Sequence, residues 1–299
     1  MKNLLTIIKF IFLGFLGLFN QSLFGQTEVA PVVAEKEGQG LLWEISGNGL
    51  ENPSFLYGTI HIISQDDFVM TEKTKEKISA SEQVVMELDM DDPKTMMGMI
   101  TKISMKDGQT LKGLLSPEDY SLLSDFFKDT LGQSLMLVEK MKPFMALSMV
   151  YPKMLGEKTA SYEMEFMKLA KKSSLEILGL ESVEDQMGIF DEIPYEDQAE
   201  MLIEFIKAYG TEKGKIEEMV QLYVDQDLKG LYEFSTQASE MEGYQDVMLD
   251  DRNVKWIPKM ENMMNEKVSF FAVGAAHLWG PKGVINLLKE QGYTVKALN

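Results

Sequence analysis

Val268-Ser-Phe-Phe-Ala-Val-Gly-Ala-Ala-His277 is the stretch of sequence that decides the fold. Its apolar run, which ends at Gly274, is typical of a buried strand. The residues that follow predict a helix over about 279–291, closed by Gly292, and a last strand over 293–298. Strands that alternate with helices form sheets covered by helices. The end of the chain therefore predicts an α/β fold.

The same alternation extends back toward the N-terminus. The apolar runs predict strands at 41–46, 54–61, 83–89 and 174–181. We expect the first two strands to form a hairpin, because Gly, Asn and Pro residues lie between them. Helical spacing of apolar residues predicts helices at 71–81, 116–172, 182–191 and 195–242. We therefore predict one α/β domain over 41–298. It has a central mixed sheet flanked by helices, and a helical insertion, at about 95–172 and 195–265, between its N- and C-terminal strands.

The first 25 residues have the order of a secretory signal peptide. Lys2 and Lys9 lead into an apolar run over 10–19, and small and polar residues follow. We expect cleavage near Gly25 and then a spacer over 26–40, with an uncleaved membrane anchor as the alternative. The chain contains no cysteine and so forms no disulfides. We expect an exported protein, periplasmic or secreted, that contacts a membrane only through this segment if it is uncleaved.

Composition and charge restrict the function. Hydrophobic residues make up 45% and charged residues 25% of the chain, as in globular proteins. The net charge is −18, and loss of residues 1–25 removes two lysines and no acids, which gives −20. A strong negative field repels phosphate backbones and anionic lipids. We therefore expect no nucleic-acid partner.

Both histidines of the chain stand three residues after a glycine. They are His61, in Gly58-Thr-Ile-His61, and His277, in Gly274-Ala-Ala-His277. Each motif follows a predicted strand, and the carboxyl ends of strands in α/β sheets form the crevice where ligands bind. Imidazole is a common metal ligand and a general base near neutral pH. The paired motifs therefore predict a site for a divalent metal or for acid–base chemistry.

These motifs, in Leu56-Tyr-Gly-Thr-Ile-His61 and Ala272-Val-Gly-Ala-Ala-His277, resemble those of the TraB/PrgY/GumN family. The resemblance covers about 41–298. It extends to three further landmarks, which are Met86-Glu-Leu-Asp89, Gly179-Leu-Glu181 with Gln186, and Asp251-Arg-Asn253 with Trp256. The sequence departs from the family where many members have Gly-(Val/Leu/Ile)-Asp. Here it has Ser161-Tyr-Glu163, in which Glu163 could replace the acid.

The resemblance implies a hydrolase. Animal TIKI proteins, which are similar to this family, act as metal-dependent proteases. In our first hypothesis His61, Glu87 and His277 bind a divalent metal, manganese, cobalt or zinc, that activates water. Glu181 then accepts a proton, and Arg252 stabilises negative charge on the intermediate or orients a substrate carboxylate.

Several alternatives remain open. Arg252 could instead anchor Glu87 and Glu181, and Asn253 is a weaker site candidate. A metal-free site would use one histidine as the base, oriented by a carboxylate. The chain could also bind peptides or hydrophobic ligands without turnover, and methionine clusters such as Met96-Met-Gly-Met99 suit an adaptable groove. In a third interpretation the helical insertion forms a partner interface. In the first two interpretations a peptide or other small molecule occupies the crevice, and the oligomeric state is not predicted.

Overall fold

The structure is a computed structural model that describes residues 39–156, 158–236 and 245–298. The predicted signal peptide and most of the predicted spacer lie outside the described residues, so export and cleavage stay predictions. In the described part of the chain, no helix is both long and apolar enough to cross a membrane.

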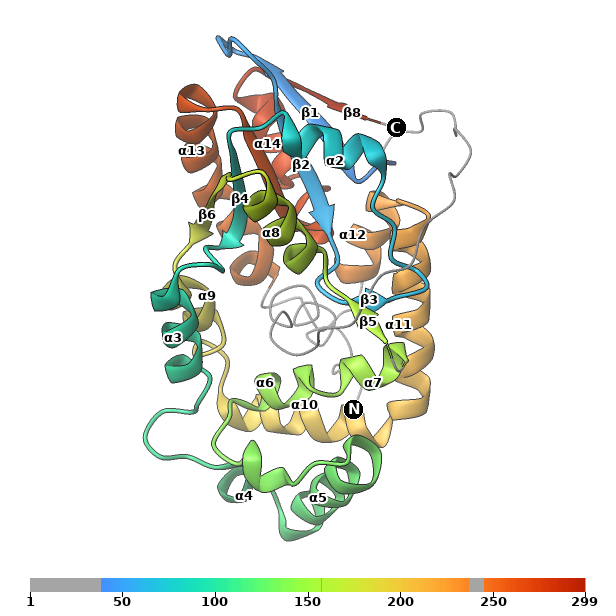
Figure 1. The fold of residues 1–299 in the computed structure, drawn as a ribbon. Helices are drawn as coiled ribbons and strands as arrows, with labels where there is room; N and C mark the ends of the chain where they lie inside the picture. The colour runs from blue at the N-terminus through green and yellow to red at the C-terminus, as the bar shows by residue number, and fades with distance from the viewer. Residues whose placement is uncertain (1–38, 157, 237–244, 299) are drawn as a thin grey trace.

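A six-stranded mixed sheet forms the centre of the fold (Figure 1). Its order is β6-β4-β7-β2-β1-β8. The first four strands of this order are parallel to one another, and β1 is antiparallel to both of its neighbours. The strands are β1 (Leu42–Gly47), β2 (Ser54–Thr59), β4 (Gln83–Leu88), β6 (Glu176–Glu181), β7 (Ser269–Gly274) and β8 (Tyr293–Ala297). The predicted α/β class and mixed sheet are confirmed.

The predicted N-terminal hairpin and C-terminal strand–helix–strand unit are both present. β1 and β2 pair with Leu42 opposite Tyr57. β7 and β8 run parallel, with β2 and β1 between them. The last helix, α14 (Val284–Glu290), begins later than predicted. The preceding loop is not helical because Gly280 has a φ of 102° and Pro281 disfavours helical backbone at the residue before it. Asn253 binds the backbone carbonyls of His277 and Lys282 on either side of this turn.

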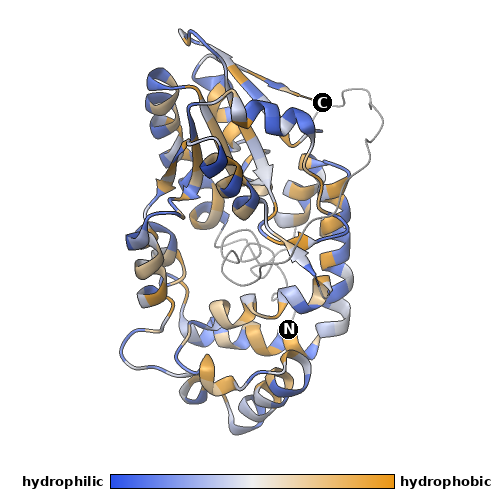
Figure 2. Cartoon of the chain, viewed as in Figure 1, coloured by the Kyte–Doolittle hydropathy of each residue, from blue (hydrophilic) through white to orange (hydrophobic). Residues whose placement is uncertain are grey.

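Helices cover both faces of the sheet. Figure 1 shows α2 (Glu72–Ser79) and α8 (Tyr162–Lys172) in front of the strands and α14 behind them, next to α13 (Asp251–Glu266). α8 contacts β4 and β6, while α13 contacts β6 and α14 contacts β8. Figure 2 shows α2 as mostly hydrophilic, whereas the three central strands β2, β4 and β7 are buried along their whole length. The core therefore lies between the sheet and its covering helices.

The predicted helical insertion is confirmed. It forms a layer beyond the carboxyl edge of the parallel strands, where α6 (Pro143–Ser148) packs on α10 (Tyr195–Lys207) (Figure 1). Both helices are rich in hydrophobic residues (Figure 2). Its first stretch contains α3 (Pro93–Lys102), α4 (Leu111–Leu114), α5 (Pro117–Leu131), α6 (Pro143–Ser148) and α7 (Tyr151–Leu155). Its second contains α9 (Val183–Ile189), α10 (Tyr195–Lys207), α11 (Tyr209–Val224) and α12 (Leu228–Thr236).

The helical prediction over 116–172 is wrong at one place that matters for the site. Thr159–Ala160 form a short strand, β5, which pairs antiparallel with β3 (Ile63–Ser64). This pairing joins the segment after His61 to the start of α8, a helix that packs on the sheet rather than in the insertion. It therefore brings Glu163 next to His61.

Two glycines allow close packing around the strand ends. A Cβ at Gly58 would lie 3.0 Å from Leu278 Cδ2 and 3.1 Å from Ala275, so the glycine of the first Gly-x-x-His motif lets β2 pack against the loop that carries the second. A Cβ at Gly179 would lie 2.5 Å from the backbone nitrogen of Asp89.

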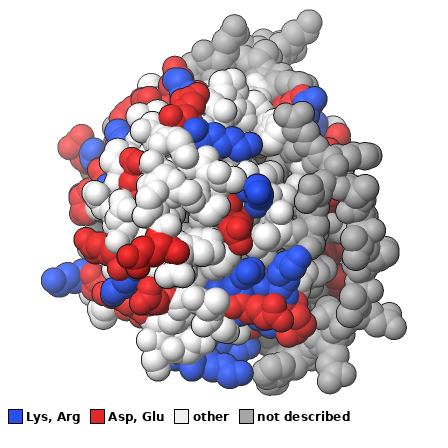
Figure 3. All heavy atoms as spheres, turned by 90° about the horizontal axis from the view of Figure 1, so that it is seen from above, with Lys and Arg blue, Asp and Glu red and all other residues white. Residues whose placement is uncertain are grey.

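Acidic and basic side chains are interspersed on the face shown in Figure 3.

Gly179→Ala should destabilise the protein, because backbone of the neighbouring strand must move to admit the methyl group. Overpacking of this kind costs about 1–3 kcal/mol. Gly188→Ala is the matched control, since its added Cβ meets nothing within 4 Å and its helix favours alanine. Urea unfolding of both variants measures the difference. Equal stability of the two variants would contradict this packing.

Candidate functional site

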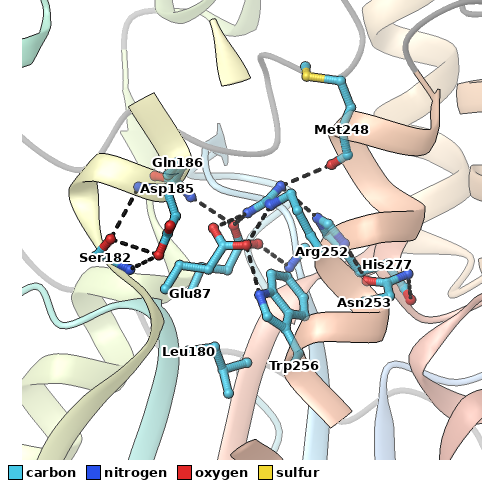
Figure 4. A network of polar contacts seen from close by, with 12 residues as sticks. Glu87, Leu180, Ser182, Asp185, Gln186, Met248, Arg252, Asn253, Trp256 and His277 are labelled. Atoms are coloured by element: carbon cyan, nitrogen blue, oxygen red, sulfur yellow. Dashed lines mark hydrogen bonds and ion pairs between the residues drawn. The ribbon is translucent and has the colours of Figure 1, made fainter. Parts of the chain in front are cut away.

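The polar site lies where four adjacent parallel strands end. Glu181 ends β6, and Glu87 is the last residue but one of β4. His277 follows β7 and His61 follows β2. Arg252 reaches the same edge from the first turn of α13, and Figure 4 shows its side chain beside Glu87 and His277. The sequence prediction that the two Gly-x-x-His motifs meet at the carboxyl edge of the sheet agrees with this geometry.

Arg252, the only arginine in the chain, is the centre of the network. Its Nε donates to Glu181 Oε1 at 2.8 Å, and its Nη2 donates to Glu181 Oε2 at 3.0 Å and to Glu87 Oε2 at 2.6 Å. Its Nη1 donates to the carbonyl of Met248 and contacts His277 Nε2, both at 3.1 Å. A guanidinium has five N–H donors. All five are therefore used within the protein, which agrees with the alternative that Arg252 anchors the two carboxylates.

Glu87 has both oxygens engaged. Its Oε1 accepts from the backbone N–H of Gly274 at 2.9 Å, and its Oε2 accepts from Arg252 and from Gln186 Nε2, the latter at 3.1 Å. The Glu87 side chain is only 7% exposed. A carboxylate buried this deeply needs a counter-charge and several donors. These contacts tie β4 to β7, to α9 and to α13.

Glu181 is engaged in the same way. Its Oε1 accepts from Arg252 Nε and, at 2.7 Å, from the indole N–H of Trp256. Its Oε2 accepts from Arg252 Nη2. In this arrangement the carboxylate orients the guanidinium. The predicted role of Glu181 as a proton acceptor stays a prediction, and these contacts favour a positioning role.

His277 is held as a neutral imidazole. Arginine can only donate, so His277 Nε2 must accept from Arg252 and the ring proton must be on Nδ1. Nδ1–H donates to Asn253 Oδ1 at 2.7 Å. The atom facing the ring is the amide oxygen, because the Asn253 amide nitrogen donates to backbone carbonyls. Burial, followed by the positive charge of Arg252 and the charge of His61, lowers the pKa of His277 well below 6.5.

His61 is in the opposite electrostatic environment. Its Nδ1 lies 2.8 Å from Glu163 Oε1, an oxygen that also accepts from the Thr59 hydroxyl at 2.7 Å. Burial alone would lower the pKa of His61, but the Glu163 carboxylate outweighs burial and raises it above 6.5. Burial would raise the pKa of Glu163, and His61 and Thr59 instead lower it to about 2. His61 Nε2 is buried and has no hydrogen-bond partner among the described residues.

The donor atoms do not fit a metal ion as they lie. In the described part of the chain no group of three or more His, Cys, Asp or Glu residues could hold one. Of the predicted ligands, His277 Nε2 and both oxygens of Glu87 already accept hydrogen bonds, and the Arg252 guanidinium lies between them. Of these predicted ligand atoms, His61 Nε2 alone has no hydrogen-bond partner within residues 39–156, 158–236 and 245–298. The predicted metal site at His61, Glu87 and His277 therefore stays a prediction that this arrangement disfavours.

The structure brings every predicted site residue into one region. The contacts among them differ from those of the metal hypothesis, because Arg252 binds the two carboxylates and Glu163 pairs with His61. Asn253, the weaker candidate, orients His277 directly. Two contributors were absent from the predicted site. Glu163 was noted only as a replacement for the acid of the family, and Gln186 only as a landmark. The pairing of β3 with β5, which brings Glu163 to His61, involves two residues in each strand and leaves no periodic signal in the sequence.

Arg252→Met should destabilise the protein strongly, because it leaves Glu87 and Glu181 as buried carboxylates without a counter-charge. Breaking a buried ion pair in this way costs about 3–5 kcal/mol. Lys267→Met is the control. Its partner is Glu176, the two side chains are 45% and 56% exposed, and such pairs contribute at most about 1 kcal/mol. Urea unfolding at neutral pH compares the two losses, and a loss below about 1 kcal/mol for Arg252→Met would contradict the network.

Glu163→Gln should destabilise the protein most between pH 4.5 and 6.5. The raised pKa of His61 stabilises the fold fully below 6.5, and this contribution is lost as pH rises through the folded pKa. The lowered pKa of Glu163 stabilises the fold above 4.5, and this contribution is lost as pH falls toward about 2. Urea unfolding at a series of pH values measures the difference from wild type.

The control for this pH series is Glu165→Gln, which changes a more exposed carboxylate on the same helix. It should show no comparable maximum. A stability difference between wild type and Glu163→Gln that stays constant from pH 3 to pH 9 would mean that His61 and Glu163 do not form an ion pair.

Comparison with known proteins gives one match. The model of the TraB/PrgY/gumN family matches residues 41–297. No match was found among curated proteins or among solved structures. The matched residues include all six strands of the central sheet and the whole polar site. The chain therefore belongs to the TraB/PrgY/gumN family.

Proposed function

We propose that the chain is an exported hydrolase-type enzyme in which His61, oriented by Glu163, is the proton-transfer group. The observation that carries this proposal is the state of the two ring nitrogens of His61. Nδ1 is paired with Glu163, whereas Nε2 is buried and has no hydrogen-bond partner among the described residues. A carboxylate on one imidazole nitrogen fixes the tautomer and leaves the other nitrogen to act as a base. This is the metal-free form of the site, with one histidine as the base.

The chemistry needs only groups of the chain and a water molecule. His61 Nε2 accepts a proton from the water as the water oxygen bonds to a substrate carbonyl carbon. The proton then passes from Nε2 to the leaving group as the carbon–nitrogen or carbon–oxygen bond breaks. Glu163 stabilises the imidazolium between the two transfers, and its low pKa keeps it ionised at neutral pH. Arg252, Glu87 and Glu181 act as positioning residues.

We propose a peptide or another small neutral molecule as the substrate. The net charge of −18 disfavours nucleic acids and other anions. We also propose a periplasmic or secreted location, on the signal-like order of residues 1–25. Cell fractionation with N-terminal sequencing of the recovered protein tests the location, and an intact N-terminus in the cytoplasm would contradict it.

One observation favours ligand binding without turnover as a second candidate. Hydrolysis of an acyl group develops negative charge on the carbonyl oxygen, which enzymes stabilise with free N–H donors. Arg252 has no such donor left, because its five N–H groups are engaged. A binder needs no such donor, so the saturated guanidinium is compatible with binding and counts against Arg252 as the group that stabilises this charge.

The test uses residues 26–299 with peptide and ester mixtures, with and without a chelator. Turnover by the wild type should survive chelation, and His61→Ala should lower kcat by about 10²–10⁴-fold, the usual contribution of a general base. Glu163→Gln should lower kcat less and shift its pH profile. Circular dichroism confirms that both variants are folded, and Lys267→Met is the control that leaves turnover unchanged.

Calorimetry with manganese, cobalt and zinc completes the test. Stoichiometric binding that both His61→Ala and His277→Ala abolish, together with metal-dependent turnover, would contradict the metal-free proposal and favour a metallohydrolase. Peptide binding without turnover would favour the second candidate.

A further inference from the structure

Gln186 has a buried oxygen that nothing in the described part of the chain satisfies. Its side chain extends from α9 toward the site (Figure 4), and the residue is 4% exposed. Its Nε2 donates to Glu87 Oε2, whereas its Oε1 has no hydrogen-bond partner among the described residues. A buried carbonyl oxygen without a donor destabilises the fold, because it has lost its hydrogen bonds to water. Such an atom beside a functional site is a candidate ligand contact.

The orientation of this amide is fixed by its neighbour. An ionised carboxylate only accepts hydrogen bonds, so the amide nitrogen of Gln186 must face Glu87. Glu87 cannot turn away, because its two oxygens are also held by Gly274 and Arg252. The unpartnered atom is therefore the oxygen, and the group it lacks is a hydrogen-bond donor.

His61 provides a second unpartnered atom in the same region. Its Nε2 accepts a hydrogen bond when the ring is neutral. After Glu163, the Glu87 carboxylate that holds Gln186 also raises the pKa of His61 against the effect of burial. No described group donates to either atom. The complementary ligand therefore carries N–H or O–H donors.

The charges of the site narrow the class of ligand further. Carboxylate and phosphate ligands need a cation with free donors, and every N–H of Arg252 is already used. Glu87 and Glu181 add negative charge at the same edge. Beside Gln186 Oε1 an anionic ligand would therefore meet an acceptor oxygen and the Glu87 carboxylate. A neutral amide presents an N–H donor without a charge.

We propose that Gln186 is a ligand-binding residue whose Oε1 accepts a backbone N–H of a peptide bound at this site. This inference rests on the proposed function for the location of the ligand, and it adds the class of ligand and the group that selects it. Gln186 thereby distinguishes amides from esters and from N-alkylated amides at one position of the ligand.

The test measures binding, so it does not depend on turnover. The probe is a pool of capped hexapeptides of randomised neutral sequence, from which the tightest binder is remade with each amide N–H methylated in turn. Titration of ¹⁵N-histidine-labelled protein gives Kd from the ring resonances of His61. One N-methylated analogue should bind wild type about 10-fold more weakly than the parent peptide, the size of one neutral hydrogen bond lost with its partner left buried.

Gln186→Met should weaken binding of the parent peptide about 10-fold. It should also bind that N-methylated analogue as well as it binds the parent. Gln198→Met is the matched control, because Gln198 is equally buried but its amide already contacts Phe144, Phe190 and Ile193. It should lower the thermal midpoint and leave the preference between the two peptides unchanged. A merely structural role of Gln186 would change stability without changing this preference.

Two results would overturn the inference. One is an unchanged preference for the parent peptide in Gln186→Met, and the other is no hexapeptide binding to wild type at millimolar concentration. Binding that shows the expected preference without any hydrolysis would instead contradict only the proposed hydrolase function.

Discussion

The site depends on one buried guanidinium whose donors are all used. Arg252 joins Glu181 at the end of β6, Glu87 near the end of β4 and His277 after β7. Removing three ionised groups from water is costly unless every donor and acceptor is paired. Arginine provides five donors in a rigid plane, whereas lysine has three on a single atom. Of the 29 lysines and arginines in this sequence all but one are lysines, and the one arginine stands where the plane of donors is required.

The same network makes two similar motifs chemically different. Each histidine follows a parallel strand by way of Gly-x-x, yet His277 meets a cation and an amide while His61 meets a carboxylate. The cation keeps His277 neutral with its Nε2 occupied, and the carboxylate favours protonation of His61 and leaves its Nε2 open. Glu87 connects the two environments, since it binds Arg252, the backbone after β7 and Gln186. The two histidines therefore support different roles in one site rather than a shared one.

Sequence patterns predicted the sheet and the place of the site because both depend on apolar runs that are long enough to be recognised as strands. The apolar runs before Gly58 and Gly274 are as long as strands, and parallel strands bring their ends together. The contacts within the site depend on shorter features. Glu163 lies next to His61 because β3 and β5 pair, and each of these strands has two residues, too few to show the alternation of apolar and polar residues typical of a strand. The saturation of Arg252 depends on side-chain conformation. The late start of α14, in contrast, has a local signal in Gly280 and Pro281 that the prediction did not use. Family resemblance marked Gln186, but only burial and the fixed orientation of Glu87 identify its oxygen as a binding atom.

The opposite states of the two histidines are tested most directly by a ¹⁵N NMR titration of their imidazole rings. Because the chain has only two histidines, the spectrum of His61→Ala assigns the resonances. The account predicts that His61 titrates with a pKa above 6.5. His277 should remain neutral, with its proton on Nδ1, down to a pH well below 6.5. Two rings that titrate together near 6.5, or a His277 proton on Nε2, would contradict the claim that Arg252 and Glu163 hold the histidines in opposite states.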